Sequence, residues 1–233
     1  MSAAAPLLTL ENADFGWGGQ AVVRGVSGAF RAGTMTAVVG PNGVGKSTLM
    51  KGLAGALAPL AGAVRRHDDG RARVAWLPQR ADLDLAFPLD VHDLVAMGAW
   101  RRTGAGRGLG AAEQARIDAA MARTGIAALA RCRLDTLSGG QLQRALFARL
   151  LVQDADLLLL DEPFAAVDTE TVHQLCRLLG ELNREGRTVI AVLHDREVVR
   201  AYFGDTLALA RADGAGRVQA WAPTPAALDG EAP

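Results

Sequence analysis

Gly40 to Thr48, the segment GPNGVGKST, constrains the fold of this chain more than any other stretch. It satisfies in full the pattern GxxxxGK followed by Ser or Thr. The glycines let backbone N–H groups turn inward around phosphate oxygens, and a following helix adds the positive end of its dipole. Lys46 can then reach the β- and γ-phosphates of a nucleotide, and Ser47 can ligate Mg²⁺. The candidate nucleotide-binding residues of this loop are Gly40, Pro41, Asn42, Gly43, Val44, Gly45, Lys46, Ser47 and Thr48.

The segments on either side of this loop support the same interpretation. Met35–Gly40 is short and apolar, as expected of a buried strand, and the spacing of the apolar residues after the loop predicts a helix from about Ser47 to Leu57. The alternative is a glycine-rich turn with a chance lysine, which explains neither the full spacing nor the two flanks.

Predicted strands and helices alternate along much of the chain. Leu7 to Phe30 reads as antiparallel strands, and VAWLPQ, ADLLLLDEP and TVIAVLH read as buried strands. Thr171–Glu185 and REVVRAYF are predicted helices, and the C-terminal part is a predicted hairpin followed by a short helix. This order indicates an α/β fold with a mainly parallel sheet.

The middle of the chain differs from this alternation. Val91–Met97 and Ala111–Thr124 are predicted helices, and the glycine-rich stretch Thr103–Glu113 between them should be mobile. Gln79 to Arg133 is therefore a predicted helical subdomain, which we place at approximately residues 80–145 within a single domain covering residues 5–233. Arg65–Arg73 is a predicted solvated hairpin.

Composition limits the partners and the compartment. Lys and Arg number 25, as do Asp and Glu, which argues against a general nucleic-acid binder. The two cysteines, Cys132 and Cys176, form no CxxC pattern, so a reducing compartment fits better than a disulfide framework or a zinc site. We expect no secretory signal and no membrane span, so any membrane role should go through another chain.

Polar residues end three of the predicted strands, at the sheet edge where open α/β sheets bind ligands. Asp161 is predicted to hold Mg²⁺ through water, and Glu162 to orient and deprotonate the attacking water. His194 is a candidate for contact with the γ-phosphate. The amide of Gln79 can meet both Mg²⁺ and the water, so the candidate magnesium ligands are Ser47, Gln79 and Asp161. The alternatives are an ordinary acidic strand end and a structural histidine.

A second glycine turn, LSGGQLQR, begins at Leu137. Ser138 and Gln141 have capping-box spacing before an apolar helix, so a well-capped helix is the simplest interpretation. Gly139 and Gly140, however, expose N–H groups beside the positive helix end, which is an anion site. One nucleotide cannot easily use both glycine turns of a chain this small. The economical solution is two copies arranged head-to-tail, in which the LSGGQ turn of one copy closes on the ATP bound by the other.

The ordered set GPNGVGKST, Gln79, LSGGQ, LLLLDEP, AAVD and VLHD resembles the ATP-binding subunit of ABC transporters over nearly the whole chain. The resemblance implies an ATPase with a P-loop NTPase, RecA-like core, an antiparallel β subdomain and a helical subdomain, and ATP and Mg²⁺ as cofactors. It places Trp17 where an aromatic residue, usually Tyr, stacks on adenine. It also places Asp168 in the loop that links the two sites across the dimer.

The segment FPLDVHDLVAMG resembles the corresponding run in importers for manganese, zinc and iron, and the C-terminal GRVQAWAPTPAAL is similar to theirs as well. In the family this region faces the membrane subunit. The resemblance therefore implies an ATPase subunit that energises a divalent metal importer through an integral membrane permease, and indirectly an extracytoplasmic solute-binding protein. Its expected place is the cytoplasmic face of the inner (plasma) membrane, peripheral through the permease.

Three other functions are alternatives to a metal importer subunit. Siderophore and haem importers share part of the same pattern. A soluble ABC ATPase of DNA repair, translation or iron–sulfur assembly would often carry tandem cassettes, coiled coils or basic arms, and the sequence shows none of these; a small assembly ATPase is the hardest of them to exclude. A P-loop kinase is disfavoured because it has no use for LSGGQ.

Overall fold

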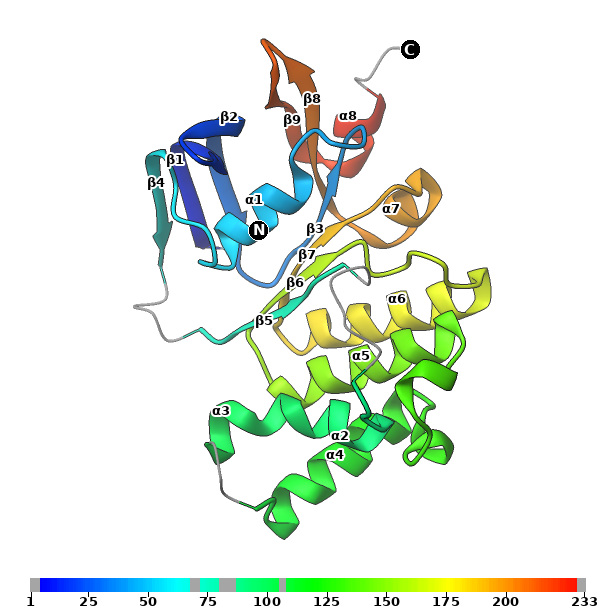
Figure 1. Cartoon of the computed structure of the whole chain (residues 1–233). Coiled ribbons are helices and arrows are strands. Elements are labelled where there is room, and N and C mark those ends of the chain that lie inside the picture. Colours follow the sequence, from blue (N-terminus) through cyan, green and yellow to red (C-terminus); the bar gives the residue numbers. More distant parts are fainter. Residues whose placement is uncertain (1–4, 68–71, 80–86, 105–107, 230–233) are drawn as a thin grey trace.

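The computed structural model describes residues 5–67, 72–79, 87–104 and 108–229. Its centre is a run of parallel strands in the spatial order β3 (Met35–Val39), β7 (Thr188–Val192), β6 (Leu157–Asp161) and β5 (Val74–Leu77) (Figure 1). On its other side β3 pairs in parallel with β8 (Asp205–Ala212). The carboxyl ends of these strands meet at one edge, as the predicted α/β fold requires.

The central strands are covered on both faces. All residues of β3, β6 and β7 are buried, which explains their continuous apolar sequences. Alternate side chains enter two different cores. Leu157 and Leu159 of β6 belong to the core that includes α1 (Lys46–Leu53), whereas Leu158 and Leu160 belong to the core that includes α5 (Gly139–Gln153) and α6 (Thr169–Arg184).

An antiparallel part completes the nine-stranded sheet of the described residues. β1 (Pro6–Trp17) and β2 (Gln20–Arg31) form a hairpin, and β4 (Ala61–Arg66) pairs with the other edge of β1. Gly18 and Gly19 in the hairpin turn both have positive φ, the conformation that tight hairpin turns require. β9 (Ala215–Pro223) pairs antiparallel with β8 and touches β2 through Val23 and Gly216. The antiparallel strands predicted at both ends of the chain are confirmed.

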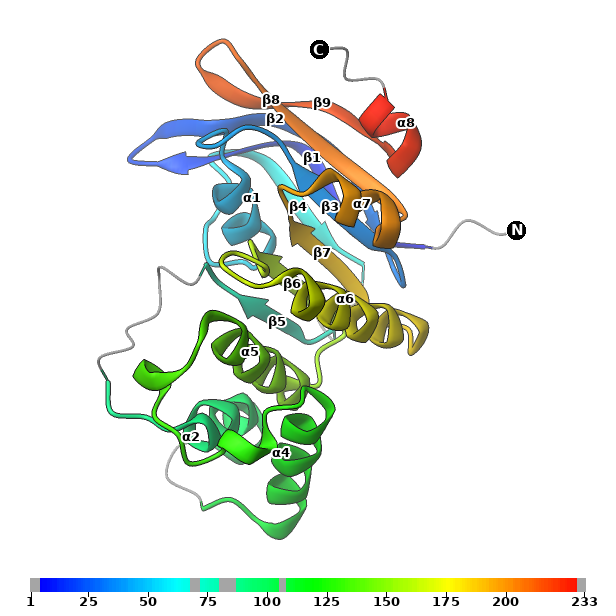
Figure 2. The ribbon, with the colours of Figure 1, turned by 90° about the vertical axis from the view of Figure 1, so that its right-hand side faces the viewer.

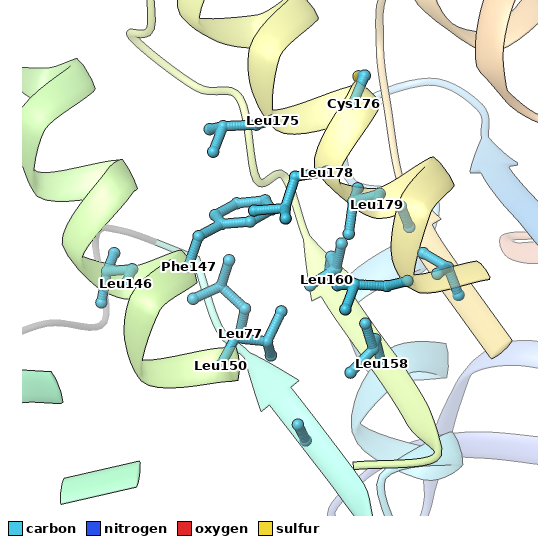
Figure 3. Close-up of a cluster of buried hydrophobic side chains, with 14 of the residues drawn as sticks. Leu77, Leu146, Phe147, Leu150, Leu158, Leu160, Leu175, Cys176, Leu178 and Leu179 are labelled. Atoms are coloured by element: carbon cyan, nitrogen blue, oxygen red, sulfur yellow. The ribbon is translucent and has the colours of Figure 1, made fainter. Parts of the chain in front are cut away.

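Helices α5 and α6 lie side by side against the sheet, and Figure 3 shows the side chains between them. Phe147 of α5 points toward Leu175 and Leu178 of α6, above Leu160 of β6 and Leu77 of β5. All five side chains are buried. Full burial of side chains of this size stabilises the fold by about 1.5–3 kcal/mol each. The last helices, α7 (Arg196–Tyr202) and α8 (Thr224–Asp229), contact each other, and α8 packs on β8 and β9 near Gly204, just before β8 begins.

The middle segment forms a helical group beyond α5, at the end of the molecule opposite the β8–β9 hairpin (Figures 1 and 2). Its helices are α2 (Val91–Ala96), α3 (Trp100–Thr103) and α4 (Ala111–Arg123), with short 3₁₀ segments η2 (Met97–Ala99), η3 (Ala127–Leu129) and η4 (Leu134–Thr136). Gly98 packs closely on α5, because a Cβ there would lie 2.5 Å from the carbonyl oxygen of Arg149. The domain limits 5–233 and the subdomain limits 80–145 stay predictions.

Several element ends differ from the sequence prediction. The helix expected to run to Leu57 ends at Leu53, because Gly55 adopts a φ of 76° and the N–H groups of Ala56 and Leu57 turn back to the carbonyl of Lys51. The strand expected to reach Gln79 ends at Leu77, since the proline that follows has no backbone donor.

The end of β7 and the start of α6 also differ from the sequence prediction. The strand expected to end at His194 ends at Val192, after which Leu193 makes one more hydrogen bond to Val38. α6 begins at Thr169 rather than Thr171, because Asp168 caps it.

Some predictions fall partly outside the described residues. The ends of the stretch expected to be mobile, Thr103–Glu113, belong to α3 and α4, and residues 105–107 lie outside the described part. The predicted hairpin at Arg65–Arg73 includes residues 68–71, and the segment after Gln79 includes residues 80–86, which also lie outside it. Among the helices that the structure describes, none combines the length and the apolar character needed to cross a bilayer.

Candidate functional site

The loop Gly40–Ser47 leaves β3 and enters α1 at the carboxyl edge of the sheet. Three of its glycines have positive φ: 146° at Gly40, 72° at Gly43 and 106° at Gly45. Space also excludes side chains here. A Cβ at Gly40 would lie 2.3 Å from the carbonyl oxygen of Leu209, and one at Gly45 would lie 2.3 Å from Cγ2 of Val23. Gly40 and Gly45 therefore leave no room for a side chain, and at Gly43 the left-handed backbone favours glycine.

Lys46 folds back over this loop. Its Nζ donates to the carbonyl oxygens of Gly40 at 2.8 Å and Pro41 at 3.1 Å, and the residue is only 5% exposed. Burial lowers the pKa of the Lys46 ammonium, while the nearby carboxylates of Glu162 and Asp161 oppose that shift. The cation thus lies inside the loop, where phosphate oxygens would meet it.

Two oxygen groups from different elements meet beside Lys46. Ser47 Oγ, in the first turn of α1, lies 3.2 Å from Oδ1 of Asp161, the last residue of β6. Asp161 is 2% exposed. A hydroxyl and a buried carboxylate at this separation form a donor set that suits Mg²⁺, which prefers oxygen ligands and keeps several waters.

Glu162 and His194 follow neighbouring strands and meet at the edge. His194 Nε2 lies 2.9 Å from Oε1 of Glu162, and both side chains are partly exposed. Glu162 has a φ of 50°, a conformation that costs energy for a residue other than glycine. Such strained residues cluster at functional sites, where the surroundings hold them in place.

Most of these groups, though not Asp161, line one pocket of about 480 Å³. Its lining residues are Val22, Asn42, Gly43, Gly45, Lys46, Ser47, Thr48, Gln79, Glu162 and His194. The structure therefore brings the glycine loop, Gln79, Glu162 and His194 together, as the sequence predicted. Val22 of β2 was missed, because its place depends on how β2 packs against the loop. Arg211 of β8 was also missed, and its guanidinium donates to the carbonyl of Gly43 at 3.0 Å.

Trp17 lies at the end of β1 and is 53% exposed. Lys51 of α1 holds its Nζ 5.5 Å from the centre of the indole ring, within the range of a cation–π interaction. Among the described residues, those lining the pocket do not include Trp17. The ring is an exposed flat surface whose orientation Lys51 restrains.

The LSGGQ turn lies at the start of α5. Ser138 Oγ accepts from the N–H of Gln141 at 3.3 Å, and Gln141 Oε1 accepts from the N–H of Ser138 at 2.9 Å, so the predicted capping box is confirmed. Asp168 caps α6 and is exposed. Within the described part of the chain, Ser138, Gly139, Gly140, Gln141 and Asp168 do not line the pocket of the same copy.

Comparison with known proteins agrees with this geometry. The protein-family description "ABC transporter" matches residues 23–165, which is more than half of the chain. The chain belongs to the ABC transporter family. As an ABC transporter ATPase it binds nucleotide and hydrolyses ATP, and its fold is that of ABC ATPase cassettes.

Curated relatives of this ABC ATPase carry the names of metal transport subunits. The manganese transport system ATP-binding protein MntB of Listeria monocytogenes is 38% identical, over 76% of this chain and 76% of the relative. The zinc transport system ATP-binding protein TroB of Treponema pallidum is 42% identical, over 76% of this chain and 68% of the relative.

Solved structures share the fold of this ABC ATPase. CbiO1 of Clostridium perfringens, described as part of the ABC transporter complex CbiONQ, matches with a TM-score of 0.76 and 28% identity, over 97% of this chain and 91% of that one. The dimeric ABC transporter cassette MJ0796 matches with a TM-score of 0.79 and 24% identity, over 93% of this chain and 98% of that one.

Proposed function

We propose that this chain is the ATP-hydrolysing subunit that energises a membrane importer for a divalent metal ion such as zinc or manganese. The observation that carries the ATPase part is the pocket that joins Lys46, at the start of α1, with Glu162 and His194, which follow β6 and β7. The metal class is supported by the names of the relatives and by the segment FPLDVHDLVAMG.

The glycine loop binds the phosphates of ATP in this proposal. Nζ of Lys46 exchanges the carbonyl oxygens of Gly40 and Pro41 for oxygens of the β- and γ-phosphates. Trp17 stacks on the adenine. Ser47, Asp161 and Gln79 hold Mg²⁺ directly or through water, because their oxygen donors fit that ion. When bound, Mg²⁺ would neutralise part of the negative charge of the phosphates.

Glu162 and His194 divide the work on the attacking water. The Glu162 carboxylate accepts a hydrogen bond from the water and takes its proton as the water attacks the γ-phosphorus. The bond from that phosphorus to the β–γ bridging oxygen breaks, and ADP and inorganic phosphate are the products. His194 donates from Nε2 to Oε1 of Glu162, which limits the rotation of the carboxylate. The backbone of Glu162 is held in a left-handed conformation. In the complex the same imidazole also lies within reach of the γ-phosphate, since both residues line the pocket.

A second copy completes the site. Among the described residues, neither the LSGGQ turn nor Asp168 lines the pocket of its own copy, so within one copy they do not cover the γ-phosphate in this proposal. A head-to-tail pair brings the turn of each copy onto the ATP of the other and gives two equivalent sites. The dimer formed by the cassette MJ0796 supports such pairing.

The membrane partner is an integral permease that docks on the helical group. Phe87 is 61% exposed and Trp100 is 65% exposed, which is unusual for large apolar residues. They flank α2 and lie within or next to Phe87–Gly98, the segment expected to face the permease. We place the chain at the cytoplasmic face of the inner (plasma) membrane through this contact, with an extracytoplasmic solute-binding protein as an indirect partner.

The experiment that tests this function is purification of the tagged chain from detergent-solubilised membranes, followed by uptake measurements with radioactive zinc and manganese. The proposal expects co-purification of a polytopic membrane protein and metal uptake that disappears with Lys46→Ala. Purification without any membrane protein, together with uptake unaffected by Lys46→Ala, would favour a soluble ABC ATPase. Uptake of a siderophore or haem, but no free metal, would move the chain to that importer class.

A further inference from the structure

Arg144 of α5 is bound to two other helices of the same copy. One guanidinium nitrogen donates to the carbonyl oxygen of Thr124 at the end of α4, at 3.2 Å. The other donates to Oγ1 of Thr171 at 3.2 Å and to Oε1 of Gln174, both on α6. Arg144 is partly buried. Its planar fork therefore fixes α5 relative to α4 and α6 at once.

The contact with Thr171 leads directly to Asp168. The N–H of Thr171 donates to Oδ1 of Asp168 at 2.9 Å, while the hydroxyl of the same Thr171 accepts from Arg144. The hydrogen bonds from Thr171 hold the pKa of the Asp168 carboxyl below its usual value, and the charge of Arg144 adds to this. One threonine thus joins the loop before α6 to the helix that starts at the LSGGQ turn.

The LSGGQ turn and Asp168 also lie close together. A Cβ at Gly140 would lie 3.2 Å from Oδ2 of Asp168 and 3.5 Å from Oγ1 of Thr171. Ser138 and Asp168 are both exposed. The two segments therefore form one continuous surface, which we call the Ser138–Asp168 surface and define as Ser138–Gln141 together with Asp168.

Both apolar packing and polar bonds join α5 to α6. Phe147 lies between the two helices together with Leu175 and Leu178 (Figure 3). Such contacts are non-directional. The hydrogen bonds from a charged guanidinium are directional and roughly twice as strong as neutral ones. Arg144 provides directional bonds from the LSGGQ helix to α6, near the end that carries Asp168.

We propose that Arg144 is a positioning residue that holds the Ser138–Asp168 surface in the shape that the partner copy's ATP site requires. The proposal rests on the two-copy site described above. Arg144 does not touch the nucleotide bound in its own copy, so its loss leaves that binding pocket intact. It acts on hydrolysis at the site of the other copy.

The first test compares Arg144→Met and Arg144→Lys with the wild type. Affinity for a fluorescent ATP analogue in the isolated chain should stay unchanged, as should the KM for ATP in the assembled complex. Because misplacement by about 1 Å can cost about 10²-fold in rate, we expect kcat to fall by about ten- to hundredfold with Met and less with Lys. Arg177→Met is the matched control, since Arg177 lies exposed on α6. An unchanged kcat, or a loss of ATP affinity equal to the loss of kcat, overturns the proposal.

The second test asks in which copy the lesion acts. Arg144→Met chains are mixed with Lys46→Ala chains. In a mixed pair one composite site carries both lesions and the other carries none, so partial recovery of activity is expected. The site without the Lys46→Ala lesion uses the nucleotide pocket of the Arg144→Met chain. If Arg144 served only the fold or the pocket of its own chain, that pocket would be defective and activity would not recover. That result overturns the proposal.

A parallel mixture of Ser138→Arg with Lys46→Ala separates this proposal from the two-copy site. Recovery with Ser138→Arg but not with Arg144→Met removes the role of Arg144 and leaves the shared site standing. If pairs of wild-type with Lys46→Ala chains are active but neither mixture recovers activity, both the role of Arg144 and the shared site are excluded. If pairs of one wild-type and one Lys46→Ala chain are inactive, the role of Arg144 is tested by the ATP-dependent dimerisation of Glu162→Gln chains. Introducing Arg144→Met into these Glu162→Gln chains should weaken the dimerisation. Unchanged dimerisation would overturn the proposed role of Arg144.

A folding defect is controlled by a milder change at the other end of the contact. Thr171→Val removes the hydroxyl that accepts from Arg144 but keeps the shape and the backbone N–H that donates to Asp168. Its thermal unfolding midpoint should stay near that of the wild type, while kcat falls in the same direction as with Arg144→Lys. A wild-type kcat for Thr171→Val contradicts the proposed path through Thr171.

Discussion

His194 Nε2 lies 2.9 Å from Oε1 of Glu162, across the ends of the adjacent strands β7 and β6. The pair lines the same pocket as Lys46. Glu162 reaches this position with a left-handed backbone, and Pro163 is buried behind it. The contact gives the carboxylate that we propose as the general base a partner that limits its rotation.

Glu162→Gln should bind ATP but hydrolyse it very slowly. Gln keeps the shape of Glu but cannot take a proton, and general-base catalysis contributes roughly 10²–10⁴-fold. The variant should accumulate as an ATP-locked dimer on size-exclusion chromatography, while the surface variant Glu11→Gln should behave as the wild type. A wild-type rate would refute the role of Glu162. A slow rate without a dimer would count against the shared site instead.

Lys46→Ala should abolish ATP turnover in the assembled complex. The ammonium of Lys46 is the only positive charge among the side chains of the glycine loop, and it already lies inside that loop. Steady-state phosphate release measures the effect, with thermal unfolding as the control for folding. Turnover near the wild-type rate would remove Lys46 from phosphate binding.

Trp17→Ala should weaken ATP binding to the isolated chain, whereas Trp17→Tyr should preserve it. Stacking of a base on an aromatic ring is worth about 1–3 kcal/mol. Binding of inorganic tripolyphosphate, which has no base, should be the same in all three proteins. Calorimetric titration compares the two ligands. Equal affinity of the Ala variant and the wild type for ATP would show that the exposed indole does not hold the adenine.

Phe87→Asp should leave ATP binding by the isolated chain intact but reduce association with the permease and stop uptake. Burying a charge in an apolar interface without a partner is costly. Leu60→Asp is the control, because Leu60 is also exposed but lies just before β4, away from the helical group. Uptake that survives Phe87→Asp would exclude a docking role for that side chain.

Much of the fold and of the pocket could be predicted from the sequence, because both depend on local signals. The glycine spacing at Gly40–Ser47 and the apolar runs that end at Asp161 and near His194 fix strands, helices and their polar ends. The positive φ of Glu162 could not be predicted, since it arises from how the loop after β6 packs. The early end of α1 at Leu53 was readable from Gly55, a residue typical of helix ends.

Contacts between distant segments could not be predicted. Arg144 meets Gln174, Arg211 meets the glycine loop, and Lys51 meets Trp17 only because the tertiary structure brings their elements together. For none of these residues does a sequence motif identify the contact partner. The LSGGQ turn is the opposite case: its motif is explicit, but its proposed ligand lies in another copy of the chain.

The central claim is that each ATP site is shared between two copies, and Ser138→Arg prepares its test. Arginine would occupy the space intended for the γ-phosphate of the partner's ATP. It also removes the helix cap, which costs about 1 kcal/mol of stability, so thermal unfolding must be measured. ATP binding to the isolated Ser138→Arg chain should stay normal, while turnover by this variant alone should be lost.

The most direct measurement is the ATPase activity of Ser138→Arg chains mixed with Lys46→Ala chains. In a mixed pair one composite site carries both lesions and the other carries neither. Pairs of wild-type with Lys46→Ala chains establish beforehand whether one intact site suffices for turnover. Where it does, the shared site predicts partial activity from two inactive parents. Continued inactivity of demonstrated mixed pairs would contradict it.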